Sequence, residues 1–369
     1  MIKLAAPDIR PSDIEVVAEV LRSGDLVQGK WVARFEGALG RFTGLPHCAL
    51  VSSCTAALHL ALLALGIKRG EAVLVPAFTF PATANVAENV GARVVMCDVD
   101  PRSYVMTPQG VKRALEADAG IRAVIVVHEF GYPAAIAEIA AIARERGVRL
   151  IEDAACALGT LADGRAPGHL GDLACYSFHP RKAVTTGEGG AVVSRDPELI
   201  ERVKRLRSHG IAISPGAAAW DFVDAGLNYR MTDFQAALGA CQLERFAAQL
   251  ASRRMQADCY LAQLNARAGM ALPLAHAGHS WQSFMVVLDP RHPRNSIRDA
   301  MLTQGIETTI GAQALNCLSY FKQRYGVSAE SCPHATLLFQ QGLVLPIHGG
   351  LSTTDSVRVS EALVRALGE

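Results

Sequence analysis

The stretch RAVIVVHEFGYPAAIAEIAAIARERGVRLIEDAA (122–155) decides the fold of this chain. It holds an apolar run at 122–130, an Ala- and Ile-rich stretch of helical periodicity at 134–147, and a second apolar run at 148–155. Short apolar runs joined by a helical stretch are typical of two parallel strands connected by a crossover helix. The pattern therefore predicts a β–α–β unit with both strands buried in one sheet.

The same alternation continues on both sides of this unit. The further predicted strands are 72–77, 93–100, 172–179 and 189–196, and the further predicted helices are 11–23, 55–66, 82–91, 107–117 and 197–210. Continuous apolar strands between helices indicate an α/β fold, in which a mostly parallel sheet is covered by helices on both faces. Ligands bind such sheets outside the carboxyl ends of the strands, so polar residues just after strands are the first candidates for chemistry.

The C-terminal third of the sequence has a different pattern. Residues 233–266 form a long Ala-rich helical tract that leads out of the predicted sheet. Beyond it come one predicted strand (283–288) and two predicted helices (294–305 and 354–368). We therefore expect a large α/β domain at 1–245, which includes the N-terminal segment, and a smaller C-terminal α+β domain at 246–369.

Composition and charge exclude several classes of protein. The chain has 369 residues, 36 Lys plus Arg and 35 Asp plus Glu, so a net charge of +1 offers no basic field for nucleic acid or anionic lipid. The uncharged stretch 49–67 contains Ser, Thr and His, which favours a buried helix over a membrane span. Nine scattered cysteines without a C-x-x-C pair and a start without an apolar signal core indicate a cytoplasmic protein with reduced thiols.

Asp153 stands at the end of the second strand of the deciding stretch. The segment IEDAACALG (151–159) surrounds it with small or apolar residues. A buried carboxylate needs a cationic partner, because an unpaired buried charge is costly. An aspartate that caps the next helix explains the segment equally well.

Lys182 lies in a Gly-rich turn between two predicted strands, in YSFHPRKAVTTGEGGAVV (176–193). Most lysines are solvated surface residues, and this is the simplest interpretation. The alternative is an amine held in a pocket, where it can act as a nucleophile. Glycines 187, 189 and 190 fit that alternative, since glycine lets the backbone approach another group closely.

A third strand end, in VSSCTAALHLAL (51–62), leads directly into a helix. The first turn of a helix offers unpaired N–H groups and a positive dipole end, which together bind anions. Ordinary capping of the helix by Ser53 or Thr55 explains the same residues. No G-x-x-x-x-G-K-[ST] nucleotide loop occurs in the chain.

One cofactor accounts for all three strand ends. Pyridoxal 5'-phosphate (PLP) has a phosphate for the anion site, a ring nitrogen for a carboxylate such as Asp153, and an aldehyde for an amine such as that of Lys182. Phe80, which follows another predicted strand, could lie on the face of the ring, although a core aromatic is an equal alternative.

In these segments the chain resembles the DegT/DnrJ/EryC1/StrS family of PLP-dependent nucleotide-sugar aminotransferases, which have the aspartate aminotransferase-like fold type I. The resemblance covers nearly the whole length. It is densest in DLVQGKWVARFE (25–36), SSCTAALHLAL (52–62), PAFTFPATANV (76–86), IEDAACALGT (151–160), YSFHPRKAVTTGEGGAVV (176–193), RSHGI (207–211) and GLNYRMTDFQAALGACQLERF (226–246).

The resemblance implies a role for each matching residue. Lys182 would form the Schiff base with the cofactor and move the proton, and Asp153 would keep the ring nitrogen protonated. Phe80 would stack on the ring, while Ser177 and the helix start at Thr55 and Ala56 would bind the phosphate.

Other matching residues would act on the substrate or across a subunit interface. Asn228 would reach the phosphate of a neighbouring subunit, so the resemblance implies a homodimer with shared active sites. Arg230 would lie near the diphosphate of the nucleotide sugar, and His179 matches a recurrent family position in the cleft. Cys156 replaces the Gln or His that relatives place near the phenolic oxygen of the cofactor, and cysteine is a weak hydrogen-bond donor.

The family resemblance also bounds the reaction. A lysine at position 182 favours transamination, because relatives with histidine there dehydrate their substrates. The segments after Lys182 and around Asn228 are more similar to members that aminate C4 of a 4-keto-6-deoxy nucleotide sugar, with glutamate as the usual donor. Amination at C3, a regulatory PLP-binding relative and a PLP enzyme of amino acids are the alternatives. A metal site is not expected, since His276 and His279 have no third ligand nearby.

Overall fold

The computed structural model describes residues 1–212, 220–265 and 269–368. Its centre is a seven-stranded sheet in the order β1-β8-β7-β6-β5-β2-β4. The strands are β1 (His47–Val51), β2 (Ala72–Pro76), β4 (Arg93–Cys97), β5 (Ile121–Val127), β6 (Arg149–Ala154), β7 (Leu173–Ser177) and β8 (Gly190–Ser194). β8 runs antiparallel to its two neighbours, β1 and β7, and the other four strand pairs are parallel. The predicted mostly parallel α/β sheet is therefore confirmed.

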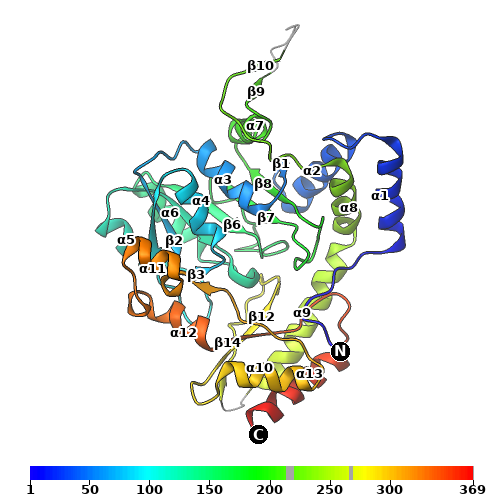
Figure 1. Ribbon diagram of the computed structural model, residues 1–369, viewed down its shortest axis with the longest axis vertical. Helices are drawn as coiled ribbons and strands as arrows, with labels where there is room; N and C mark the ends of the chain where they lie inside the picture. Colours follow the sequence, from blue (N-terminus) through cyan, green and yellow to red (C-terminus); the bar gives the residue numbers. More distant parts are fainter. Residues whose placement is uncertain (213–219, 266–268, 369) are drawn as a thin grey trace.

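Helices cover both faces of this sheet, as Figure 1 shows. One face carries α3 (Cys54–Ala64), α4 (Ala82–Asn89) and α7 (Pro197–Leu206), and the other carries α2 (Lys30–Thr43), α5 (Pro108–Ala117), α6 (Ile136–Glu145) and α8 (Asp233–Glu244). Successive residues of a strand enter different cores: Ile151 packs with α3, whereas Leu150 packs with α6. Apolar residues on both faces explain why these strands read as continuous hydrophobic runs.

A second core lies below the sheet in Figure 1. It is built from α9 (Phe246–Leu264), α10 (Arg294–Thr303), α13 (Thr353–Leu367) and a three-stranded sheet of β11 (Met270–Ala271), β12 (Phe284–Leu288) and β14 (Gly342–Leu345). Ile2 joins this core through hydrogen bonds to the backbone of Gly305 and Glu307. The division of the chain into domains at residue 245 stays a prediction.

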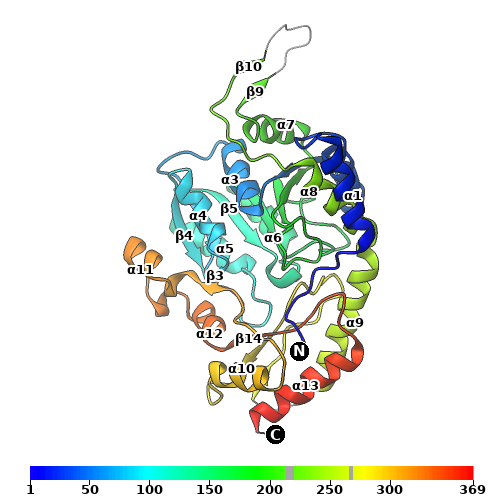
Figure 2. The same ribbon diagram turned by 45° about the vertical axis from the view of Figure 1, so that its right-hand side comes forward.

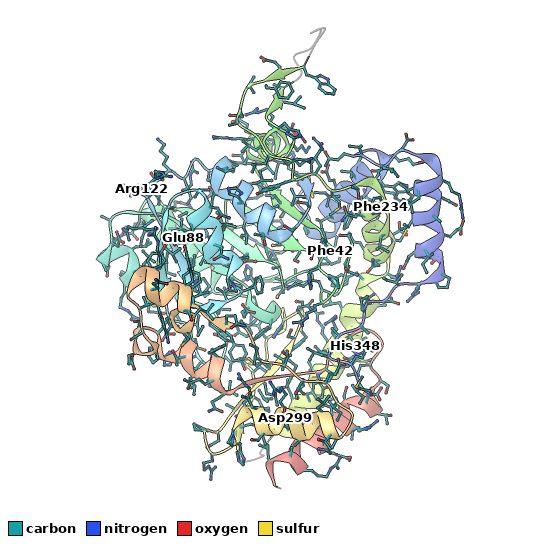
Figure 3. The ribbon with its side chains drawn as sticks, in the orientation of Figure 1. Phe42, Glu88, Arg122, Phe234, Asp299 and His348 are labelled. Atoms are coloured by element: carbon teal, nitrogen blue, oxygen red, sulfur yellow. The ribbon has the colours of Figure 1, made fainter. Side chains whose placement is uncertain are left out.

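The helices α11 (Ser319–Tyr325) and α12 (Pro333–Gln341) were not expected from the sequence, and they pack beside the large sheet. Glu88 of α4, labelled in Figure 3, accepts a hydrogen bond from the hydroxyl of Tyr325. A short two-stranded pair of β3 (Phe78–Thr79) and β13 (Gln313–Ala314) and the turns η2 (Leu315–Cys317) and η3 (Ala329–Ser331) complete this region. Residues 78–89 and 313–341, which are far apart in the sequence, therefore lie side by side next to the large sheet.

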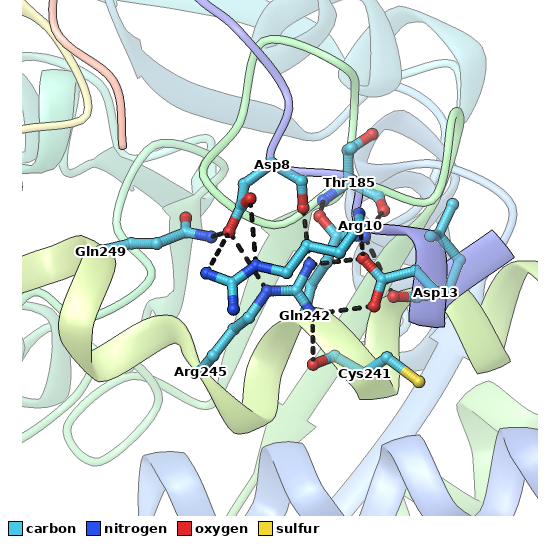
Figure 4. A network of polar contacts seen from close by, with 9 residues as sticks. Asp8, Arg10, Asp13, Thr185, Cys241, Gln242, Arg245 and Gln249 are labelled. Carbon is cyan, nitrogen blue, oxygen red and sulfur yellow. Dashed lines mark hydrogen bonds and ion pairs between the residues drawn. The ribbon is translucent and has the colours of Figure 1, made fainter. Parts of the chain in front are cut away.

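The predicted helical tract 233–266 is two helices, because α8 ends at Glu244 and α9 begins at Phe246. Arg245 between them has non-helical backbone angles. Its guanidinium turns back to Asp8, which precedes α1 (Pro11–Ser23), and to Asp13 in the first turn of α1 (Figure 4). The ion pairs with Asp8 hold the pKa of that carboxyl below its usual value, although burial opposes them. The break in the tract thus anchors the N-terminal segment.

An arm extends from the end of the molecule that lies opposite the second core in Figures 1 and 2. It carries the paired strands β9 (Ile211–Ala212) and β10 (Asp221–Phe222). Within the three described ranges, no helix combines the length and the apolar character that crossing a bilayer requires.

Candidate active site

A cavity of about 610 Å³ lies at the carboxyl ends of β5, β6 and β7, between the large sheet and the second core. This volume is within the usual range for ligand sites. Seven of the residues singled out from the sequence line it: Thr55, Phe80, Asp153, Cys156, Ser177, His179 and Lys182. Residues 309–312, 344–345 and 347 of the C-terminal part form the opposite wall.

Asp153 is a buried carboxylate with two hydrogen bonds. The hydroxyl of Thr83 on α4 donates to Oδ2 at 2.9 Å, and the backbone N–H of Ala155 donates to Oδ1 at 3.0 Å. Burial raises the pKa of Asp153, and these two donors and the charge of Lys182 offset the rise only in part. No helix begins after Asp153, since the next element is β7, so the alternative of a helix-capping aspartate is wrong.

Lys182 is not a solvated surface lysine. Its side chain enters the cavity from the loop between β7 and β8, and its Nζ lies 2.9 Å from the Sγ of Cys156. Burial raises the pKa of the Cys156 thiol, so this thiol stays protonated and the amine faces a weak partner. Lys182 is therefore accessible to a ligand in the cavity.

Two glutamine side chains hold the loop that carries Lys182, and each forms two hydrogen bonds with main-chain atoms of that loop. Gln282, just before β12, donates to the carbonyl of Arg181 at 2.8 Å and accepts from the N–H of Ala183 at 3.2 Å. Gln242 of α8 makes the same kind of pair with the N–H and carbonyl of Thr185 (Figure 4). The peptide groups around Lys182 are thus fixed from α8 on one side and from the second core on the other.

The start of α3 leaves donors open toward the cavity. The Oγ of Ser53 caps the helix by accepting from the N–H of Ala56, so capping does occur. Within the described residues, the N–H groups of Cys54 and Thr55 have no hydrogen-bond acceptor, and both residues line the cavity. A Cβ at Gly190 would lie 2.5 Å from the backbone of Ser53, so only glycine lets β8 approach this helix start.

Three predicted site residues lie outside the cavity of this chain. Ala56 is buried within α3, and its N–H is used by Ser53. Asn228 is exposed, and its backbone pairs with Ser208, while Arg230 pairs with Val51 beside the end of β1. The structure therefore brings together seven of the ten predicted site residues and leaves outside the cavity one residue expected at the phosphate, one at the substrate and one at a neighbouring subunit.

The histidines near the site have ordinary partners. His128 Nδ1 accepts from the N–H of Ala134, so its Nε2 donates to buried Glu152 at 2.9 Å. His279 stacks on Trp281 with ring centroids 3.7 Å apart. In the part of the chain that the structure describes, no three His, Cys, Asp or Glu side chains gather as metal ligands do.

Sequence reasoning missed Thr83, Glu129, Gln242 and Gln282. Thr83 and Gln282 line the cavity but come from a helix and from a loop of the second core, and nothing in their local pattern links them to Asp153 or Lys182. Glu129 had a usable signal: it is a charged residue near the end of the predicted strand 122–130, and it lies two residues beyond the end of β5, at the edge of the sheet where ligands bind.

Comparisons with known proteins identify the family of this chain. The model of the DegT/DnrJ/EryC1/StrS aminotransferase family matches residues 7–364. The uncharacterized protein MJ1066 of Methanocaldococcus jannaschii is 30% identical over 98% of this chain and 97% of its own length. The structure of the aminotransferase TlmJ from Streptoalloteichus hindustanus has a TM-score of 0.92 at 33% identity and covers 100% of this chain and 99% of TlmJ.

The protein Spr1654 from Streptococcus pneumoniae, solved in a PLP form, has a TM-score of 0.91 at 26% identity and covers 98% of this chain and 97% of its own. These matches extend over the whole α/β architecture, so the predicted aspartate aminotransferase-like fold is confirmed. The chain belongs to the DegT/DnrJ/EryC1/StrS aminotransferase family.

Proposed function

We propose that this protein is a PLP-dependent aminotransferase that converts a nucleotide-linked keto-sugar to an amino sugar, with glutamate as the amino donor. The observation that carries the proposal is the meeting of Lys182, Asp153 and the open start of α3 in one cavity. Membership of an aminotransferase family supplies the reaction class.

The residues of the cavity fit the three polar parts of PLP. Among the residues that the structure describes, none forms an ion pair with the buried carboxylate of Asp153, and a protonated ring nitrogen would provide one. The open N–H groups of Cys54 and Thr55, with the hydroxyl of Ser177, suit a phosphate. Phe80 is 72% exposed and lines the cavity, so its ring is available as a stacking platform.

Bound PLP supplies an electron sink for the carbon that loses its proton. The chain supplies the rest of the chemistry. Lys182 holds the cofactor and then takes and returns the proton at the reacting carbon, since its amine is fixed by the clamped backbone. Asp153 keeps the ring nitrogen protonated, and the second core closes the cavity on the side away from the sheet.

The finer assignments belong to this proposal as well. The resemblance favours a 4-keto-6-deoxyhexose over a 3-keto sugar, a homodimer in which Asn228 serves the neighbouring site, and a place for Arg230 near the diphosphate of the nucleotide sugar. We also propose a cytoplasmic location. The exposed position of Asn228, outside its own cavity, is consistent with service to a neighbour. The nine free thiols are consistent with a reducing compartment.

The test is a panel of nucleotide keto-sugars incubated with PLP-loaded protein and glutamate. Product mass reports transamination, and the position of the new nitrogen separates C4 from C3 amination. Glutamate alone should bleach the yellow colour of the loaded protein. A protein that stays colourless with PLP, or that keeps its colour with glutamate and aminates no sugar, contradicts the proposal and favours a regulatory relative.

A further inference from the structure

The amine of Lys182 and the thiol of Cys156 are in direct contact inside the cavity. The Nζ of Lys182 lies 2.9 Å from the Sγ of Cys156, and both residues line the cavity. Cys156 stands just after β6, and Lys182 stands on the loop between β7 and β8, so two separate parts of the chain bring the pair together. The proposed function uses the amine and assigns no step to the thiol.

The other cysteines of the chain do not share this arrangement. Cys54, which also lines the cavity, donates to the backbone carbonyl of Cys175 at 3.6 Å. The sulfur atoms of Cys97 and Cys317 likewise contact oxygen atoms. Within the residues that the structure describes, Cys156 is therefore the only cysteine whose sulfur forms a hydrogen bond with a nitrogen atom.

The main chain fixes both members of the pair. Gln282 holds the peptide groups on the two sides of Lys182. The carbonyl of Cys156 accepts a hydrogen bond from the Oγ of Ser280 at 3.5 Å. A Cβ at Gly131, in the turn η1 (Glu129–Gly131), would lie 3.0 Å from the same carbonyl oxygen, so this part of the chain is closely packed. A sulfur that gains an oxygen atom thus stays beside the amine, which favours a reaction between the two.

The thiol of Cys156 is within reach of small oxidants. Its side chain is only partly buried, and it borders a cavity of about 610 Å³. Thiols react with peroxides through the thiolate form. Burial raises the pKa of Cys156, and the positive charge of Lys182 lowers it in part, whereas burial raises the pKa of Cys54 further. Of the two thiols in the cavity, Cys156 is thus the more readily oxidised.

We propose that Cys156 and Lys182 form a reversible covalent S–N bridge, a sulfenamide, when the cofactor-free protein meets hydrogen peroxide. First, the sulfur attacks a peroxide oxygen and the O–O bond breaks. The sulfur is oxidised to a sulfenic acid, the peroxide is reduced, and the departing hydroxide takes the thiol proton as water. The neutral amine then attacks the sulfur, the S–OH bond breaks, and hydroxide leaves with one proton of Nζ as a second water. One thiol, one amine and one peroxide therefore give the bridge and two water molecules.

The bridge blocks the nitrogen that the proposed function assigns to the capture of PLP. A small thiol reverses it: attack at the sulfur frees the amine of Lys182 and leaves a mixed disulfide on Cys156, which a second thiol reduces. PLP already held by Lys182 occupies the amine and protects the pair. The bridge itself rests on the contact between Sγ and Nζ, and only its effect on PLP capture rests on the proposed function.

The test treats the cofactor-free full-length chain with hydrogen peroxide and digests it without a reductant. We expect mass spectrometry to find the peptides of Cys156 and Lys182 joined, with a mass lower than their sum by two hydrogen atoms. The treated protein should lose its yellow band on addition of PLP and regain it after a thiol reductant, and PLP added before peroxide should prevent the loss.

Two serine variants separate the bridge from other oxidation. Cys156→Ser should give no joined peptides, and its colour with PLP should be the same with and without peroxide treatment. Cys156→Ala gives the same comparison if the serine variant does not fold. Cys259→Ser, in α9 and outside the cavity, is the matched control and should form the bridge as the wild type does.

Lys182→Ala distinguishes the bridge from a disulfide, which is also lighter by two hydrogen atoms. Without the amine, the sulfur of Cys156 should stop at the sulfenic acid, which a 1,3-diketone probe traps. A loss of two hydrogen atoms at Cys156 that persists in Lys182→Ala overturns the inference. So does a wild-type chain in which Cys156 is oxidised, or survives as the thiol, without joined peptides. Capture of PLP by Lys182→Ala with the same yellow band contradicts the proposed function instead and leaves the bridge standing.

Discussion

Glu152 and Asp153 are adjacent in the sequence, both acidic and both buried, and they lie on opposite faces of β6. Glu152 faces a closed set of donors: His128 and the N–H groups of Gly168 and Gly171. Asp153 faces the cavity, with two donors and room for a cation. The difference teaches that burial of an acid says little about its role. What separates a structural carboxylate from a functional one is whether its partners all come from the protein.

The largest expected loss of activity comes from a change in the cavity that Asp153 faces. Lys182→Ala removes the amine that shares the cavity with Asp153, and we expect turnover to fall by more than about a thousandfold. The yellow colour should also be lost, while circular dichroism and the oligomeric state stay unchanged. Transamination assays of the purified variant check this. Retained activity would show that another amine does the work.

Asp153→Asn removes the negative charge and keeps the size of the side chain. We expect weaker PLP binding and a fall in kcat of about a hundredfold, since a neutral amide no longer keeps the ring nitrogen protonated. Titration with PLP and steady-state kinetics measure the two effects. Unchanged rates would mean that the buried charge of Asp153 serves the fold, as that of Glu152 does.

Glu152→Gln is the matched change on the closed side. The amide NH₂ would meet the N–H of His128, whose other ring nitrogen already accepts from Ala134, so one donor loses its acceptor. An unsatisfied buried donor lowers the free energy of unfolding by about 1–3 kcal/mol. Chemical denaturation measures that loss, and kcat should stay within a few-fold of the wild type. A loss of PLP binding equal to that of Asp153→Asn would erase the distinction between the two faces.

Gln282→Met changes none of the groups to which the chemistry in the cavity is assigned. It deletes both hydrogen bonds to the peptides that flank Lys182. We expect kcat to fall about tenfold with little change in KM, since the two lost hydrogen bonds together contribute about 1.4 kcal/mol to the positioning of the amine. Stopped-flow and steady-state kinetics check the split. A rise in KM alone would place Gln282 in substrate binding.

Much of the fold could be predicted from local patterns. Apolar strands alternate with helices between residues 72 and 206, and every strand predicted there is present in the sheet. The helix α2 was missed because its start has no cap in its own sequence. Asp233, about two hundred residues later, accepts from Gly29 and Val32 instead. The break at Arg245 was missed for the same reason, since its partners Asp8 and Asp13 lie at the other end of the chain.

The site divides in a similar way. Asp153, Ser177 and Lys182 stand next to strand ends, so their meeting in one cavity follows from parallel strands. Thr83 and Gln282 could not be predicted, because a hydroxyl on a helix and an amide in a distant loop carry no local signature of their targets.

Gln242 and Gln282 form their hydrogen bonds with main-chain atoms, which has a consequence for the loop between β7 and β8. The side chains of Arg181, Ala183 and Thr185 contribute nothing to these contacts, which involve only peptide N–H and carbonyl groups. A randomised library at position 181 or 183 should therefore yield many active members, whereas proline at 183 or 185 removes a gripped N–H and should not. The amino-acid sequence of this loop can thus be redesigned while its backbone conformation stays fixed.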